Sequence, residues 1–173
     1  ARAVRHLAGL GCTSIAYLGP VRSLRCAGYR TALEACGLEL RPELLWDCRW
    51  SMEEAFTVAG QRLQTLGGVD GVFAASDELA LGLLRAASTL GIAIPGRLRV
   101  VGHDDHPWSS FISPALTTIR VPVREMAVTA VRRLLERLSG ERTFPVHSFL
   151  PPALLVRESC GAEGGNVSRR TDA

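Results

Sequence analysis

The feature that most constrains the fold of this chain is the alternation of short apolar runs with longer segments of helical periodicity. The apolar runs are rich in β-branched and aromatic residues and predict strands near 14–19, 44–48, 71–76, 98–102 and 116–121. The segments between them predict helices near 2–10, 23–36, 52–66 and 78–90. Such an alternation is typical of an α/β fold, in which helices cover both faces of a parallel sheet.

The last third of the chain departs from this pattern. Apolar residues over 123–138 recur at helical spacing and form one continuous stripe that must pack on another surface. A final strand, "ALLVRES", follows Pro151 and Pro152. The segment 160–173 has the Gly, Ser and Asn content of a disordered tail, and we expect it to be one.

Composition excludes several classes of protein. No apolar stretch is long enough to cross a bilayer, so the chain reads as a soluble domain without a membrane partner. A net charge of +3 is too small to indicate a nucleic-acid surface by itself. The five cysteines are an odd number without a C-x-x-C pair, which favours a reduced, cytoplasmic setting and argues against a zinc site. No phosphate loop, dinucleotide fingerprint or nucleophile elbow occurs, so no cofactor or catalysis is indicated.

The stretch "VVGHDDHPW" sets two carboxylates between two histidines directly after a predicted strand. A metal site is one interpretation, but successive loop residues point in different directions and no supporting ligand patch lies nearby. A hydrolytic carboxylate pair is another, although adjacent residues rarely converge on one bond. A purely structural role for Asp104 in capping the turn is the third. The interpretation we favour is an ionised acceptor for ligand hydroxyls or amines.

Three further residues follow predicted strands and lie where the crevice of such a sheet opens. Arg25, in the first turn of a helix, can fork over a polar ligand or simply be solvated. Trp50 can provide an aromatic plate for a sugar or a base, or can pack against the start of the next helix. Ser76 can contact a ligand or can cap a helix together with Asp77.

The helix over 78–90 is apolar nearly all round, and it includes Leu81 and Leu84. A helix of this kind is buried on more than one side. We expect one side to face the sheet and another to suit a partner subunit in a homodimer.

Five ordered motifs resemble the LacI/GalR family of transcriptional regulators. The block "VFAASDELALGLLRAASTLGIAIPGRLRVVGHDD" resembles the family's strand, Asn/Ser-Asp, helix, G-x-x-[IV]-P and [VI]-G-[FY]-D-D sequence. "SPALTTIRVP" resembles its P-x-L-T-T-[IV] segment, "LRCAGYRTAL" its R-x-x-G-[FYW] helix, and "LLVRES" its closing L-V-x-R-x-S. The resemblance extends over about residues 1–159.

The resemblance implies the effector-binding region of a repressor-type regulator, with a fold like that of type I periplasmic sugar-binding proteins. Family members bind operator DNA as dimers through an N-terminal helix-turn-helix that this chain lacks, and they hold a small molecule between two subdomains. By the same resemblance, Arg25, Trp50, Ser76 and Asp104 match ligand-binding positions. Leu81 and the pair Phe111 and Ile112 match positions where subunits pack.

The family topology also implies a division of the chain, which begins with Ala1 and which we expect to be an excerpt of a longer protein. Residues 1–115 would form the C-terminal subdomain, and 116–150 would supply a strand and helix to the missing N-terminal subdomain. Residues 151–159 would form the returning strand, ahead of the tail over 160–173. Alone, the chain should neither bind operator DNA nor hold ligand tightly.

Two departures from the family pattern leave the effector open. His103 replaces the usual aromatic residue before the Asp pair, and the roles of His103 and His106 are undecided. The loop "GPVRSLRC" is shorter than the common family loop ahead of Arg25. We expect a sugar, with a purine as the other candidate. A solute-binding receptor of a sugar transporter is the alternative function, and a sugar-acting enzyme finds support only in the Asp pair.

Overall fold

The computed structural model describes residues 1–140, 144 and 147–162 of the chain. Six strands form a single sheet in the order β2-β1-β3-β4-β5-β6. All neighbours from β2 to β5 run parallel, and β6 runs antiparallel to β5. The strands are β1 (Ile15–Leu18), β2 (Leu45–Trp46), β3 (Gly71–Ala74), β4 (Arg99–Asp104), β5 (Thr117–Arg120) and β6 (Ala153–Leu155).

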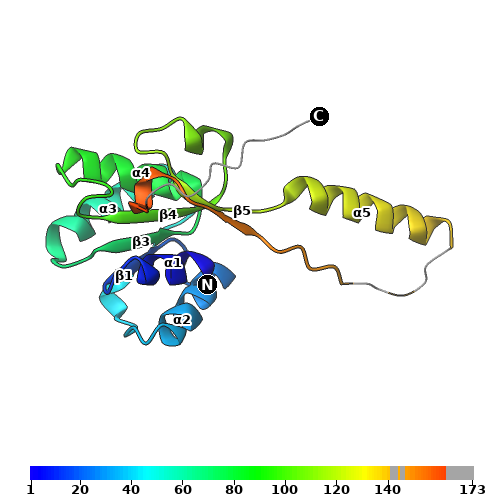
Figure 1. Ribbon diagram of the computed structural model, residues 1–173, viewed down its shortest axis with the longest axis horizontal. Coiled ribbons are helices and arrows are strands. Elements are labelled where there is room, and N and C mark those ends of the chain that lie inside the picture. Colours follow the sequence, from blue (N-terminus) through cyan, green and yellow to red (C-terminus); the bar gives the residue numbers. More distant parts are fainter. Residues whose placement is uncertain (141–143, 145–146, 163–173) are drawn as a thin grey trace.

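Helices cover both faces of this sheet, with α1 and α2 on one side and α3 and α4 on the other (Figure 1). They are α1 (Arg2–Gly9), α2 (Leu24–Ala35), α3 (Met52–Thr65) and α4 (Asp77–Thr89), with α5 (Val123–Leu138) further along the chain. Short 3₁₀ turns occur at η1 (Pro42–Leu44), η2 (Pro107–Ser110) and η3 (Glu158–Cys160). The predicted α/β class is therefore confirmed.

Serine side chains fix the starts of three of these helices. Ser23, Ser51 and Ser76 are the N-caps of α2, α3 and α4, and each hydroxyl accepts a hydrogen bond from the backbone N–H three residues later. Because every one of these helices follows a strand, the caps determine where the chain turns away from the carboxyl end of the sheet. All residues of β1 and β3 are buried, as expected for parallel strands covered on both faces.

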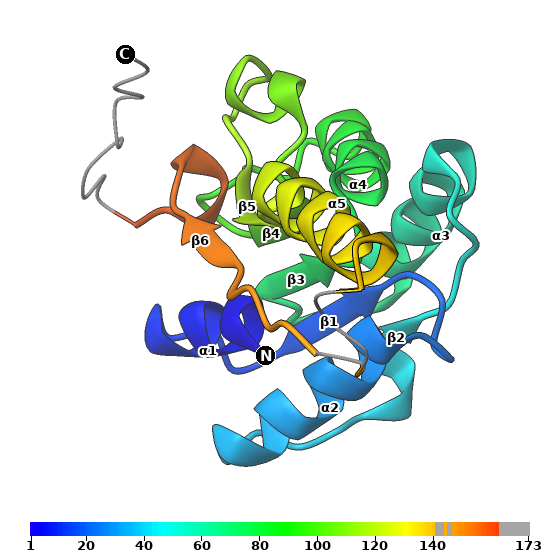
Figure 2. The same ribbon diagram turned by 90° about the vertical axis from the view of Figure 1, so that its right-hand side faces the viewer.

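The segment from β5 through α5 to β6 leaves this layered body. Figure 1 shows α5 extending beyond the sheet, and Figure 2 shows β6 beside β5. None of the α5 residues is buried, and Leu134, Leu135 and Leu138 are each more than half exposed. The apolar stripe predicted over 123–138 thus faces solvent in this chain. The predicted division of the chain at residue 116 stays a prediction.

The start of the expected tail is ordered, so the predicted boundary at residue 160 is wrong. Ser159 and Cys160 are fully buried at the end of η3. The Ser159 hydroxyl donates to the Val100 carbonyl oxygen at 2.7 Å and accepts from the Thr117 backbone N–H at 2.9 Å. These bonds join η3 to β4 and β5. The Gly-rich sequence that follows η3 gave no indication of them. The rest of the expected tail, 163–173, lies outside the described residues.

None of the helices in the described residues has the length and apolar character needed to cross a membrane.

Candidate effector-binding site

The candidate site lies at the carboxyl ends of the strands, where the chain connections reverse direction. Strand β1 has β2 on one side and β3 on the other, which makes this the switch point at which ligands bind in open α/β sheets. A hollow of about 470 Å³ opens there, within the size range typical of small-molecule sites. Its lining includes all four residues expected from the sequence, namely Arg25, Trp50, Ser76 and Asp104.

Arg25 connects three parts of the site. Its Nη1 donates to the Ala75 carbonyl oxygen at 2.6 Å, and its Nη2 lies 2.9 Å from Oδ1 of Asp104. Its guanidinium carbon stands 5.3 Å from the centre of the Trp50 ring, within the range of a cation–π contact. The side chain keeps about a third of its surface exposed. Arg25 therefore links the ends of β3 and β4 and still offers donors to a ligand.

The start of helix α2 is fixed by Tyr17, which lies on β1. The Tyr17 hydroxyl is 2.7 Å from the Ser23 hydroxyl, and Ser23 caps the helix that carries Arg25. Burial raises the pKa of Tyr17 to about 12, although the hydrogen bond with Ser23 opposes this shift. The phenol therefore stays neutral at physiological pH and can hold the cap.

Trp50 and Ser76 contribute in different ways. The Trp50 side chain precedes the N-cap of α3 and is 52% exposed, so most of the indole is available to a flat apolar ligand face. Ser76 is buried, and its hydroxyl oxygen accepts the Leu79 N–H at 3.2 Å. The structural interpretation of Ser76 as a helix cap is confirmed, while the residue also lines the hollow.

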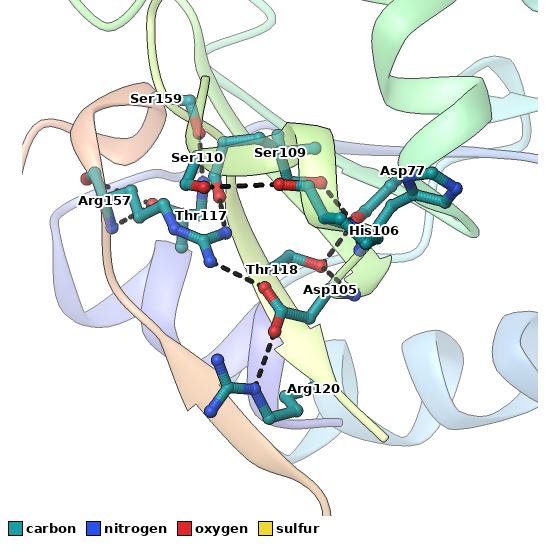
Figure 3. Close-up of polar contacts among 12 residues, drawn as sticks. Asp77, Asp105, His106, Ser109, Ser110, Thr117, Thr118, Arg120, Arg157 and Ser159 are labelled. Carbon is teal, nitrogen blue, oxygen red and sulfur yellow. Dashed lines mark hydrogen bonds and ion pairs between the residues drawn. The ribbon is translucent and has the colours of Figure 1, made fainter. Parts of the chain in front are cut away.

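Asp105 is not among the residues that line the hollow, and its contacts stabilise the end of β4. Its Oδ1 accepts from Nη2 of Arg157 and its Oδ2 from Nε of Arg120, each at 2.6 Å (Figure 3). The carboxylate is only 10% exposed, and its backbone N–H donates to Thr118 Oγ1 at 3.3 Å. Asp105 therefore supports the loop after β4, held by Arg120 at the end of β5 and by Arg157, which follows β6.

A second buried carboxylate, Asp77, lies at the start of α4, where it also lines the hollow. Its Oδ1 accepts from the Thr118 hydroxyl at 2.6 Å, and its Oδ2 accepts from the Ser109 hydroxyl at 2.6 Å and the His106 backbone N–H at 2.8 Å (Figure 3). A Cβ at Gly102 would stand 2.3 Å from Asp77 Oδ1, so only glycine fits on β4 opposite this carboxylate. Asp77 thus has a structural role, because it joins the start of α4 to β5 and to the η2 turn.

Three further residues line the hollow: Asp77, which the sequence suggested only as a helix cap, and Glu78 and His106, which it did not assign to the site. Glu78 is exposed at the start of α4, and the His106 ring lies 4.7 Å from the Trp108 ring. Glu78 directly follows Asp77 and His106 directly follows Asp105, both near the carboxyl ends of strands. Their position in the sequence could therefore have indicated that they lie near the hollow. Among the described residues, no group of three or more His, Cys, Asp and Glu side chains is placed to hold a metal ion.

The four residues expected at a subunit interface differ in accessibility. Phe111, directly after the η2 turn, is 87% exposed, whereas Leu81 and Ile112 are half-buried. Leu84 belongs to the core of the chain itself and is only 8% exposed, so little of its surface is left for a partner. The apolar circumference of α4 arises because this helix packs on α3 as well as on the sheet.

Comparisons with known proteins agree with this architecture. Residues 4–160 match the family described as periplasmic binding protein-like domain. The HTH-type transcriptional regulator reg1 of Streptomyces lividans is 38% identical over 179 residues, covering 96% of this chain and 51% of that protein. The structure of a transcriptional regulator CelR–cellobiose complex superposes with a TM-score of 0.84 at 32% identity, over 91% of this chain and 50% of that one.

A LacI family regulator from Enterococcus faecium with bound ribose gives a TM-score of 0.81 at 28% identity, over 91% of this chain and 60% of that one. The chain spans about half the length of the curated relatives that it matches. The strand order, the matched residues and the relatives all agree, and the chain belongs to the LacI family as one of its periplasmic binding protein-like domains.

Proposed function

We propose that this chain is the effector-binding and dimerising part of a repressor-type transcriptional regulator that responds to a sugar. The observation that carries the proposal is the ion pair of Arg25 and Asp104 beside the exposed face of Trp50, all three lining one hollow. A pyranose has hydroxyl edges that need donors and acceptors and a ring face that packs on an aromatic plate. These three side chains offer both.

The relatives support a regulator over a transport receptor, because those named above are transcriptional regulators and two solved structures hold cellobiose or ribose. They likewise give no support to a sugar-acting enzyme. Since the chain corresponds to about half of its relatives, we assign operator DNA recognition to a helix-turn-helix outside the present sequence. All five cysteines are free thiols, which fits the cytoplasmic location that a regulator of transcription in bacteria requires.

The mechanism we propose is a population shift. A sugar that bridges the hollow and a second subdomain binds one closure of the cleft better than another, and this difference in affinity is the only energy available for switching. Homodimerisation through Phe111, Leu81 and Ile112 would couple the closure to the spacing of two DNA-binding heads. The exposure of Phe111 supports its place in that contact.

Calorimetric titration tests the proposal on the regulator at its full natural length. Cellobiose, ribose, adenine and guanine form the first panel, since a purine is the alternative effector class. We expect a sugar to bind and Asp104→Ala to abolish that binding. The matched control is Glu43→Gln, which removes a carboxylate from the similarly exposed Arg41–Glu43 pair. Equal affinity in Asp104→Ala and the parent would refute the site, and purine binding alone would refute the sugar.

A further inference from the structure

His103 occupies the position at which the family pattern has an aromatic residue, and its contacts indicate a role in positioning Asp104. It lies on β4 next to Asp104, and only 17% of its side chain is exposed. Its Nδ1 stands 2.8 Å from Oδ1 of Asp104. Within the described part of the chain His103 is not among the residues that line the hollow. His103 therefore reaches the lining of the hollow through its contact with Asp104.

The two oxygens of Asp104 have different surroundings. Oδ1 receives both Nδ1 of His103 at 2.8 Å and Nη2 of Arg25 at 2.9 Å, and two donors are what one carboxylate oxygen accepts through its two lone pairs. In the described residues Oδ2 receives no donor from the protein. Because Asp104 lines the hollow, Oδ2 is the acceptor left for a ligand.

The backbone alone does not hold this carboxylate in place. Asp104 has a φ of 116° and Asp105 a φ of 56°, and 42% of the Asp104 side chain is exposed. A partly exposed aspartate at the end of a strand would otherwise lose rotamer freedom when it bound a ligand. Two donors that approach Oδ1 from β4 and α2 remove that freedom before a ligand arrives, which is preorganisation in the usual sense.

We propose that His103 is a positioning residue that, together with Arg25, fixes Oδ1 of Asp104 and thereby presents Oδ2 as a single acceptor for one hydroxyl of the effector. The inference rests on the proposed function for the identity of the ligand, but the contact between His103 and Asp104 is independent of it. An ionised carboxylate only accepts, so Nδ1 of His103 must carry the proton. In the neutral ring Nε2 is then unprotonated, and Asp104 selects the tautomer.

The tautomer gives a test that needs no ligand. Two-bond ¹H–¹⁵N correlation spectra of histidine-labelled 173-residue chain, at about pH 8.5 where ordinary imidazoles are neutral, report which ring nitrogen is protonated. The four histidines are few enough to assign by substitution, and exposed His147 serves as internal reference. We expect the Nδ1–H form for His103, lost in Asp104→Ala. An Nε2–H form in the parent, or a pattern indifferent to Asp104→Ala, would overturn the proposal.

Binding of cellobiose, measured by calorimetry on the regulator at full length, tests the consequence for affinity. His103→Phe supplies the aromatic ring without the donor, and we expect it to weaken binding about three- to tenfold, the cost of fixing a side chain during binding. His103→Asn retains an N–H donor near the position of Nδ1 and should stay within about twofold of the parent. Equal losses in both variants, or none in His103→Phe, would contradict a positioning role. If the parent binds adenine or guanine but no sugar, the sugar proposal fails, while the tautomer test still decides whether His103 positions Asp104.

Discussion

Arg25 and Asp104 are 79 positions apart in the sequence, yet Nη2 of the first lies 2.9 Å from Oδ1 of the second. The pair joins the start of α2 to the end of β4 in the lining of the hollow. Because 32% and 42% of these side chains are exposed, water screens the pair, and its value lies in orienting donors and acceptors more than in holding the fold.

We therefore expect Arg25→Lys and Asp104→Asn to reduce sugar affinity at least about tenfold while changing the free energy of unfolding by less than about 1 kcal/mol. Lysine keeps the charge but cannot bridge the Ala75 carbonyl and the Asp104 carboxylate at once. Calorimetry measures the affinity, and urea unfolding measures the stability. A loss of stability that accounts for the loss of binding would show that the pair is structural.

Asp77 should behave in the opposite way, because it is 2% exposed and accepts three hydrogen bonds. Asp77→Ala leaves the Thr118 and Ser109 hydroxyls without their acceptor, and we expect the free energy of unfolding to fall by about 3 kcal/mol. Urea unfolding checks this. The control is Ser110→Ala, which removes an exposed hydroxyl next to the same network and should change stability by less than about 0.5 kcal/mol.

Much of this arrangement could be predicted from the sequence, because parallel strands bring their carboxyl ends to one edge. Arg25, Trp50 and Ser76 come after the ends of three different strands and Asp104 ends β4, so the alternation placed them at one edge of the sheet, and the family resemblance singled them out as ligand-binding positions. The partners of Asp105 could not be predicted in this way. Arg120 and Arg157 lie 15 and 52 positions away, and their convergence depends on the antiparallel return of β6 beside β5.

Burial was the other property that local pattern could not decide. Leu84 reads as one more apolar residue on an all-apolar helix, and only the packing of α4 against α3 and the sheet shows that the chain covers it. Cys160 stands at the start of a Gly-rich segment, and its burial depends on the contacts of η3 with β4 and β5.

The two arginines that hold Asp105 should contribute unequally. Arg157 is 17% exposed and also donates to the Leu116 carbonyl oxygen at 2.7 Å, whereas Arg120 is 42% exposed. We expect Arg157→Met to lower the free energy of unfolding by about 3 kcal/mol and Arg120→Met by about 1 kcal/mol or less. Urea unfolding of the two variants side by side provides its own control. Equal losses in the free energy of unfolding would show that Arg120 stabilises the fold as much as the less exposed Arg157 does.

Alkaline pH should destabilise the protein from about pH 9 upward. Burial, with nearby Glu54 and Asp47, raises the pKa of the Cys48 thiol from 9.0 to about 12, and burial raises that of Tyr17 from 10.0 to about 12. Above pH 9 the unfolded chain therefore loses protons that the folded chain keeps, so the stability that is complete below pH 9 is lost as pH rises toward 12. The slope approaches about 1.4 kcal/mol per pH unit for each such proton.

Urea unfolding between about pH 8 and 11 measures this slope, with the range set by the ordinary thiol and phenol pKa values. Cys48→Ala should make the loss of stability just above pH 9 shallower without abolishing it, because burial also raises the pKa of the Cys12 thiol, and the phenols of Tyr17 and Tyr29 add to the loss above about pH 10. A stability that stays constant through this range would show that these groups titrate alike in both states.

Two helical glycines allow the packing of α3 against α4 to be tested with changes of opposite sign. A Cβ at Gly82 would stand 2.4 Å from the Met52 carbonyl oxygen and 2.9 Å from the Phe56 backbone nitrogen, so α3 would have to move. We expect Gly82→Ala to lower the free energy of unfolding by about 2 to 3 kcal/mol through overpacking.

Gly60 lies within α3, and the nearest atom to its added Cβ, on Ala86, would be 4.0 Å away. There the change to alanine should raise stability by about 0.5 to 1 kcal/mol, because alanine restricts the unfolded chain and favours the helix. Since α4 begins beside the hollow, Gly82→Ala should also weaken sugar binding while Gly60→Ala leaves it intact. Changes of the same sign in both variants would mean that the two helices do not cross at Gly82.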